Sequence, residues 1–217
     1  MTKEIVIAAY NKDIDWINDI SPDVKKTIYQ KGDIVRPNEI PLPNFGRCVH
    51  TFFNHLLINY NQLSEITFFG QEYPFDHWEN IVEIVNGTME NCIDKSTIRI
   101  GGYFGFHFNT VGSMWEMKPS SQFESGKIIT CDSNGGPHTS MTLNVDSYWD
   151  KLFDSKPPTN YDFLPGGHFG ITKQHVHLRP ITFYNQIVDL LSSDDIVPYV
   201  IERLECYIFS PNFKIKQ

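Results

Sequence analysis

Two short apolar runs, each followed at once by polar residues, constrain the fold of this chain more than any other feature of its sequence. Residues 5–10 are Ile-Val-Ile-Ala-Ala-Tyr, and residues 65–70 contain the run Ile-Thr-Phe-Phe. Strands that are apolar at successive positions are buried on both faces, which is typical of parallel sheets covered by helices. The two runs therefore predict two buried strands of an α/β sheet.

Segments with helical spacing alternate with the strand-like segments. Residues 45–60 place apolar side chains on one face, and residues 77–85, 182–191 and 196–209 also have helical spacing. We expect a short helix over 13–20 and strands over 26–30, 127–131 and 140–145, whereas Pro37, Pro41 and Pro43 exclude regular structure up to Asn44. The order of elements favours a sheet covered by helices on both faces, in one domain over residues 1–217.

The charge balance argues against nucleic acid or an anionic membrane as a partner. Acidic residues number 26 against 18 basic ones, so the formal net charge is -8, whereas both partners need clustered positive charge. No stretch approaches the roughly 18 apolar residues of a membrane span, and the first residues lack the apolar region of a secretory signal. The four cysteines form no C-x-x-C pair, so free thiols and a cytoplasmic location are expected.

The end of the first apolar run is one candidate binding site. Ligands of open α/β sheets bind at the carboxyl ends of the strands. Tyr10 and Asn11 stand there and could stack on and hydrogen-bond a nucleotide base. The alternative is that Tyr10 is an aromatic residue of the core.

The end of the second run carries side chains that suit a metal ion. Gln71, Glu72, Asp76 and His77 supply oxygen ligands and an imidazole, a set that suits Mg²⁺ or Mn²⁺. A divalent ion there could bridge a diphosphate and offset charge on a departing phosphate. The alternative is that Asp76 caps a helix beginning near His77, since Asp is a preferred N-cap. Spacing alone favours the cap, and both roles can coexist.

Two further places could contact a ligand. Arg47 falls in the first turn of the helix expected after Asn44, a candidate N-cap. Free backbone N–H groups and a guanidinium together form a good phosphate site, although Arg47 could instead be a surface residue. His168 follows Gly166 and Gly167, which allow a ligand to approach the backbone closely.

Several segments, in order along nearly the whole chain, resemble one family. Residues 9–16 and 28–32 resemble its opening, and residues 43–52 resemble its N-x-G-R-E-x-H-T-Y block. Residues 67–77 resemble its strand ending F-x-Q-x-x-P-F-D-H, residues 166–172 its G-A-Q-F-A-V-S segment, and residues 202–209 its closing helix. This is an uncharacterised family, widespread in fungi, that is similar to glycosyltransferases of the nucleotide-diphospho-sugar fold. The chain also resembles the amino-terminal glycosyltransferase domain of a chlorella virus protein that decorates the capsid.

The resemblance implies a glycosyltransferase-A fold, with a mixed, mostly parallel sheet and helices on both faces. It implies transfer of a hexose or deoxyhexose from a UDP-sugar to a glycan hydroxyl, for example on a viral capsid glycoprotein. The chain would then be a cytoplasmic enzyme, in a host cell if it is viral, and could be one module of a longer polypeptide.

The resemblance also implies roles for the candidate residues. Asp76 would hold Mn²⁺ or Mg²⁺, with Gln71, Glu72 or His77 completing the ligands, and Asp76 and His168 are the expected catalytic residues. The expected donor-binding residues are Tyr10, Asn11, Arg47, Gln71, Gly166 and Gly167.

Three residues depart from the family pattern. Cys48 stands where the family has Glu, His168 where it has Gln, and Glu205 where it has Trp. No D-x-D motif follows the third strand.

Two other classes of function fit the composition. A non-catalytic glycan-binding module could stack sugars on Trp78, Tyr103, Trp115 and Trp149. A metal-dependent hydrolase could use the eight histidines.

Overall fold

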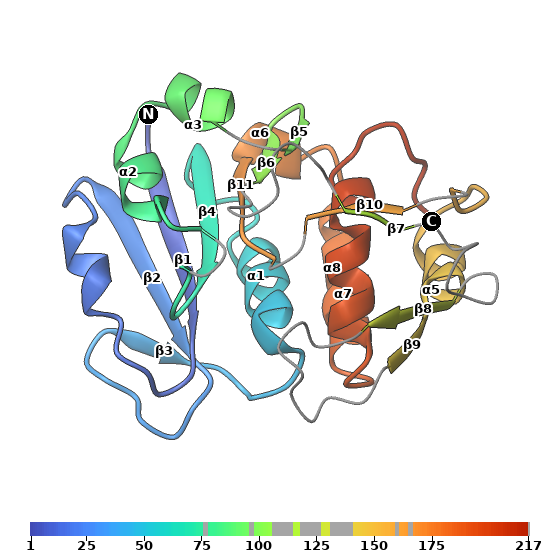
Figure 1. Cartoon of the computed structure of the whole chain (residues 1–217), viewed down its shortest axis with the longest axis horizontal. Helices are drawn as coiled ribbons and strands as arrows, with labels where there is room; N and C mark the ends of the chain where they lie inside the picture. The colour runs from blue at the N-terminus through green and yellow to red at the C-terminus, as the bar shows by residue number, and fades with distance from the viewer. Residues whose placement is uncertain are drawn as a thin grey trace.

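One sheet of seven strands organises the protein. The computed structural model describes residues 1–75, 78–95, 98–105, 115–117, 127–130, 141–158, 161–164 and 167–216. The strand order in the sheet is β3-β2-β1-β4-β11-β6-β5 (Figure 1). The strands are β1 (Lys3–Ala9), β2 (Val24–Gln30), β3 (Glu39–Pro41), β4 (Ile66–Gln71), β5 (Ile98–Ile100), β6 (Tyr103–Gly105) and β11 (Phe169–Thr172).

The direction of the strands changes across the sheet. β3, β2, β1 and β4 are parallel neighbours. β11 is antiparallel to both β4 and β6, and β5 is antiparallel to β6. The predicted α/β architecture with a mixed sheet is confirmed, but parallel pairing is limited to four strands, so the sheet is only half parallel.

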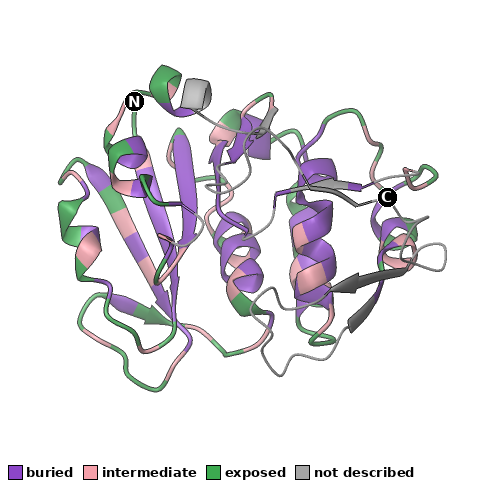
Figure 2. Cartoon of the chain, in the orientation of Figure 1, coloured by how far each residue is buried: buried purple, intermediate pink, exposed green. Residues whose placement is uncertain are grey.

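The apolar runs form the centre of the sheet because both faces of these strands are covered (Figure 2). Val6 and Ala8 of β1 face one core, and Ile5 and Ile7 face the other. β4 divides its apolar side chains in the same way. A charged residue in these runs would be buried on either face, which explains their almost continuous hydrophobicity.

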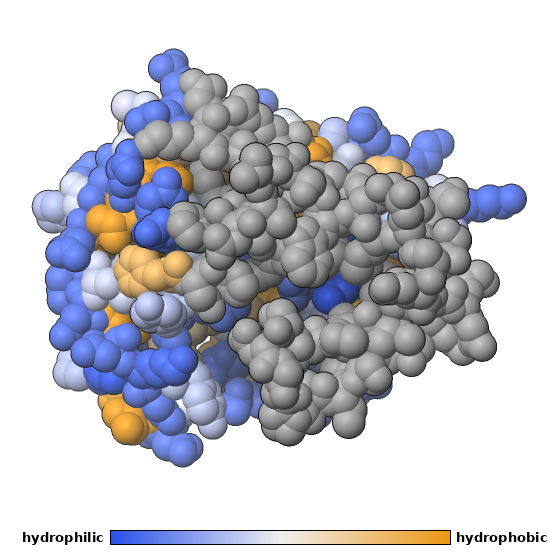
Figure 3. All heavy atoms as spheres, viewed as in Figure 1, coloured by the Kyte–Doolittle hydropathy of each residue, from blue (hydrophilic) through white to orange (hydrophobic). Residues whose placement is uncertain are grey.

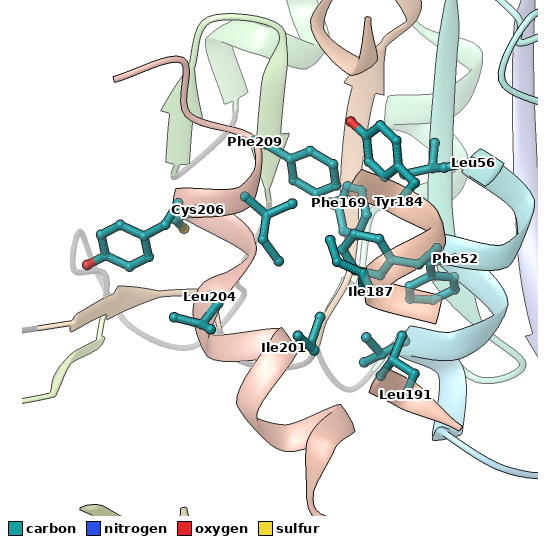
Figure 4. Packing of buried hydrophobic residues seen from close by; sticks show 14 of the residues in the cluster. Phe52, Leu56, Phe169, Tyr184, Ile187, Leu191, Ile201, Leu204, Cys206 and Phe209 are labelled. Atoms are coloured by element: carbon teal, nitrogen blue, oxygen red, sulfur yellow. The ribbon is translucent and has the colours of Figure 1, made fainter. Parts of the chain in front are cut away.

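Helices cover both faces. The 3₁₀ helix η1 (Asp15–Asp19), α2 (Ile81–Asn86) and α3 (Met89–Lys95) lie on one face. On the other, α1 (Arg47–Ile58) packs on α7 (Ile181–Leu191) and α8 (Val197–Ile208). Figure 4 shows their shared core, in which Phe52 of α1, Phe169 of β11 and Ile201 of α8 point toward one another.

The remaining elements lie outside the central sheet. α6 (Lys173–Val176) follows β11 directly and packs beside it (Figure 1). Toward the end of the molecule that carries α8 lie α5 (Val145–Leu152) and two small ladders, β7 (Trp115–Met117) with β10 (Tyr161–Phe163), and β8 (Lys127–Thr130) with β9 (Met141–Asn144). The last pair confirms the two strands expected over 127–131 and 140–145.

Three sequence-based boundaries are wrong. A short edge strand, β3, includes Pro41, because a proline at a sheet edge need not donate a ladder hydrogen bond. α1 begins at Arg47 with Gly46, not Asn44, as its N-cap. α2 begins at Ile81 with Asn80 as its N-cap, and not near His77; the expected cap, Asp76, lies outside the described residues.

None of the helices in the described ranges is both long and apolar enough to cross a membrane. The described surface on the face in Figure 3 is mostly hydrophilic, with its apolar residues scattered.

The strand order creates a binding crevice. The chain places β2 and β3 on one side of β1 and then returns to place β4 on the other. Such a reversal leaves a crevice at the carboxyl ends of the two central strands, where ligands of open α/β sheets bind.

Candidate functional site

A pocket of about 350 Å³ occupies this crevice. This volume is within the range of small-molecule sites. Its lining comes from the ends of β1, β2 and β4 and from the start of α1. The residues are Ala8, Ala9, Tyr10, Lys31, Asn44, Arg47, Cys48, Gln71 and Glu72. The structure thus brings together Tyr10, Arg47, Gln71 and Glu72, four residues singled out from sequence.

Glu72 fixes the loop that follows β1. Its Oε2 accepts hydrogen bonds from the backbone N–H groups of Tyr10 at 2.6 Å and Lys12 at 3.2 Å. Its Oε1 lies 3.8 Å from the Lys12 ammonium. The carboxylate expected to hold a metal ion is therefore engaged in anchoring this loop, which leaves the Tyr10 side chain half exposed at the pocket.

Asn11 stabilises the adjoining loop and does not line the pocket. Its backbone is left-handed, with φ 65°, which Asn tolerates better than most residues. The side-chain oxygen accepts a hydrogen bond from Ile34 N–H at 3.0 Å. We expected the Asn11 side chain to contact a nucleotide base. In the structure it contacts the loop after β2 instead.

The N-terminus of α1 opens onto the pocket. No side chain caps this helix, whose first residue is Arg47. The first N–H groups of a helix have no partner within it, and they carry partial positive charge. An anion in the pocket would meet these groups.

The side chain of Arg47, the first residue of α1, packs against Tyr199 of α8. Its Nη1 donates a 2.7 Å hydrogen bond to the Tyr199 hydroxyl, and the guanidinium carbon is 4.9 Å from the centre of the Tyr199 ring. These contacts orient the side chain, and a guanidinium retains donors for a second partner. Tyr199 was not identified from the sequence, because nothing in the local pattern connects residues 152 positions apart.

Lys31 was also missed from the sequence. Its side chain is only 7% exposed, and Nζ donates to the carbonyl oxygens of Phe45 and Arg47 at 2.5 and 2.7 Å. Burial lowers the pKa of Lys31 to about 8, so most molecules still carry this charge at pH 7. A lysine directly after a predicted strand was the available signal.

Two side chains of α1 at or near the pocket are neutral: Cys48, which lines it, and His50, which does not. Burial raises the pKa of the Cys48 thiol to about 12, with a smaller contribution from Glu202, and Gln71 Nε2 lies 3.4 Å from its sulfur. Burial, with the neighbouring Lys31, lowers the pKa of His50 to about 4. Both side chains are therefore neutral at pH 7. The charged residues that line the pocket are Lys31, Arg47 and Glu72, and the Glu72 carboxylate is paired with Lys12. The local positive charge therefore comes from Lys31, Arg47 and the helix.

Other predicted site residues lie elsewhere. His168 is 1% exposed and stacks on Trp78, with ring centroids 6.2 Å apart. Neither it nor Gly167, which is left-handed at φ 64°, is among the residues lining the pocket. The predictions for Asp76, His77 and Gly166 fall outside the described residues.

Three of the four aromatic residues proposed to stack on glycans are unsuited to that role. Trp78, Tyr103 and Trp149 are at most 1% exposed. The side chain of Trp115 lies outside the described part of the chain. These three rings fill the core and cannot stack on a sugar at the surface. The structure therefore argues against a glycan-binding module that uses them.

The hydrolase alternative lacks a visible metal centre in the described ranges, which omit Asp76 and His77. Within them, no three His, Cys, Asp or Glu residues come together as possible ligands. His50, His55, His168 and His175 are buried.

The fold and site define an α/β protein with a cationic pocket at the switch point of its sheet. The family described as "Protein of unknown function (DUF3431)" matches residues 5–216, and the chain belongs to it. No curated protein and no solved structure matches the chain.

Proposed function

We propose that this protein is a glycosyltransferase that binds the diphosphate of a UDP-sugar in the β1–β4 pocket and transfers the sugar to a glycan hydroxyl. In this reaction the acceptor hydroxyl gives up its proton to a base or to solvent, its oxygen bonds to the anomeric carbon, and the bond from that carbon to the phosphate oxygen breaks, so that UDP leaves. Negative charge grows on the departing diphosphate. Groups that offset this charge lower the barrier.

The observation that carries the proposal is the gathering of positive charge in an acidic protein. The chain has a net charge of -8, yet Lys31, Arg47 and the uncapped start of α1 meet at one pocket. This combination favours an anionic ligand over a neutral one. The Tyr10 ring at the same pocket offers a surface for a base.

Mn²⁺ or Mg²⁺ belongs to the proposal through Asp76 and His77. Glu72 fits less well as a ligand, because its carboxylate already accepts two backbone hydrogen bonds. When bound, a divalent ion would neutralise part of the diphosphate charge. The acceptor could be a glycan of a viral capsid glycoprotein, as the resemblance implies.

A thermal-shift comparison of UDP, GDP and ADP, each with and without Mn²⁺, tests the proposal. A ligand that binds only the folded state raises the melting temperature. UDP should raise it most, and more so with Mn²⁺. Equal shifts for the three nucleotides would leave only a diphosphate site, and no shift for any of them would remove the proposed donor.

The expected catalytic role of Asp76 has its own test. Asp76→Ala should abolish metal-dependent release of UDP from UDP-sugars and leave the melting temperature without ligand nearly unchanged. Glu79→Ala, at a nearby exposed residue, is the control. Normal turnover of Asp76→Ala would exclude Asp76 from catalysis.

A further inference from the structure

The turn that begins α1 has an unusual backbone. Gly46 and Arg47 are both left-handed, with φ 66° and 52°. In the described residues, the other non-glycine residues with positive φ are Asn11 and Asn38, and Asn tolerates this conformation. Arg47 does not share that tolerance, so its backbone is strained.

Gly46 is required at the first of these positions. A Cβ atom there would lie 2.5 Å from the His50 Cβ and 3.1 Å from the Leu191 carbonyl oxygen. The chain therefore approaches α1 and α7 as closely as only glycine allows. Arg47 follows in a conformation that it does not prefer.

Strain persists where the surrounding structure holds it in place. The Lys31 ammonium donates to the carbonyl oxygens of Phe45 and Arg47, which lie on either side of Gly46. Lys31 is nearly fully buried, and a buried ammonium group is costly unless it is well hydrogen-bonded. Its two bonds to one turn are strong, because they involve a charged donor.

The strained turn has a direct consequence for the pocket. Arg47 lines the pocket, and its guanidinium is held at one end by Tyr199 of α8. Relaxation of the backbone at Arg47 would change the direction in which its side chain leaves the helix. The turn therefore keeps a cation aimed at the pocket before any ligand arrives.

We propose that Lys31 is a positioning residue, whose ammonium group holds the Gly46–Arg47 turn in its left-handed conformation and so presents the Arg47 guanidinium to an anionic ligand. The nature of that ligand rests on the proposed function; the conformational role of Lys31 does not. Lys31 thus acts on the ligand in two ways, through its own charge at the pocket and, to a greater extent, through Arg47.

The first test needs no ligand. Arg47→Gly and Arg47→Ala both remove the guanidinium, but only glycine is free of left-handed strain. Arg47→Gly should melt about 2–4 °C above Arg47→Ala, although glycine is normally the poorer residue in a helix. A melting temperature for Arg47→Gly at or below that of Arg47→Ala would overturn the proposal.

The second test asks whether Lys31 holds the turn. In a Lys31→Met background the advantage of glycine over alanine at position 47 should shrink or reverse, because the turn can relax. Lys31→Gln, which keeps one donor, should retain part of the advantage and serves if Lys31→Met does not fold. An undiminished advantage in both backgrounds would show that something other than Lys31 holds the turn.

UDP binding gives the functional consequence. Lys31→Met should weaken UDP binding about tenfold, and by a much smaller factor in the Arg47→Ala background, since most of its effect passes through Arg47. An equal factor in both backgrounds would make Lys31 a direct ligand contact and contradict the positioning role. If the wild type does not bind UDP, the proposed function fails, while the two ligand-free tests still decide the role of Lys31.

Discussion

Replacing Glu72 by alanine distinguishes an anchor of the β1 loop from a metal ligand. The carboxylate accepts hydrogen bonds from the N–H groups of Tyr10 and Lys12 and lies near the Lys12 ammonium. If this anchoring is its main task, Glu72→Ala should destabilise the protein even when no metal ion is present.

The size of the effect follows from these contacts. A hydrogen bond to a charged group contributes about 1.5–3 kcal/mol, but both N–H groups are exposed and water can replace the carboxylate. The ion pair with Lys12, whose side chain is 69% exposed, adds less than about 1 kcal/mol. Together we expect about 1–3 kcal/mol, or a melting temperature lower by roughly 2–12 °C for a chain of this length.

The assay is thermal unfolding in chelator and in Mn²⁺, with Glu79→Ala as the control at an exposed position. If Glu72 anchors the loop, Glu72→Ala should lower the melting temperature by the same amount in both conditions. The reasoning would be refuted if Glu72→Ala melted at the wild-type temperature in chelator and Mn²⁺ stabilised the wild type but not the variant. Glu72 would then be a metal ligand.

Three more predictions follow from the structure. Burial would raise the pKa of Glu4, but the neighbouring His55, whose Nε2 lies 3.6 Å from the carboxylate, together with Thr27 and Lys25, lowers it to about 2. Glu4 therefore contributes stability above pH 4.5 that is lost as pH falls toward 2, and the stability advantage of the wild type over Glu4→Gln in urea unfolding should shrink over that range; a constant difference would contradict this. Cys48 is half-buried, and its raised pKa should make it react slowly with iodoacetamide at pH 8, and more slowly still with UDP bound; rapid labelling detected by mass spectrometry would contradict the raised pKa. Tyr10→Ala should reduce the preference for UDP over GDP in calorimetry, and an unchanged ratio would remove Tyr10 from base recognition.

The central sheet was predictable because its signal is local. Residues 5–10 and 65–70 are apolar on both faces, and the carboxyl-edge rule then identifies Tyr10, Gln71 and Glu72 as pocket residues. Arg47 was predictable for a similar reason, since it follows a recognisable helix start. These inferences needed only the spacing of the apolar residues and the rule that ligands bind at the carboxyl ends of the strands.

The rest of the site depends on contacts between distant segments. Tyr199 reaches Arg47 from a helix at the other end of the chain, and Lys31 turns inward to carbonyl groups of the α1 turn. No local pattern reveals that Glu72 turns back to the β1 loop or that His168 is buried beneath Trp78. Sequence reasoning found the right edge of the sheet but assigned some of its side chains the wrong neighbours.

Calorimetric titration with UDP at fixed Mn²⁺, for the wild type and Arg47→Lys, tests the central claim most directly. A guanidinium can make a bidentate bond to phosphate that an ammonium cannot reproduce. The account predicts saturable binding of one UDP to the wild type, and binding weakened about tenfold in Arg47→Lys. The absence of saturable binding to the wild type, or equal affinity of the two proteins, would contradict it.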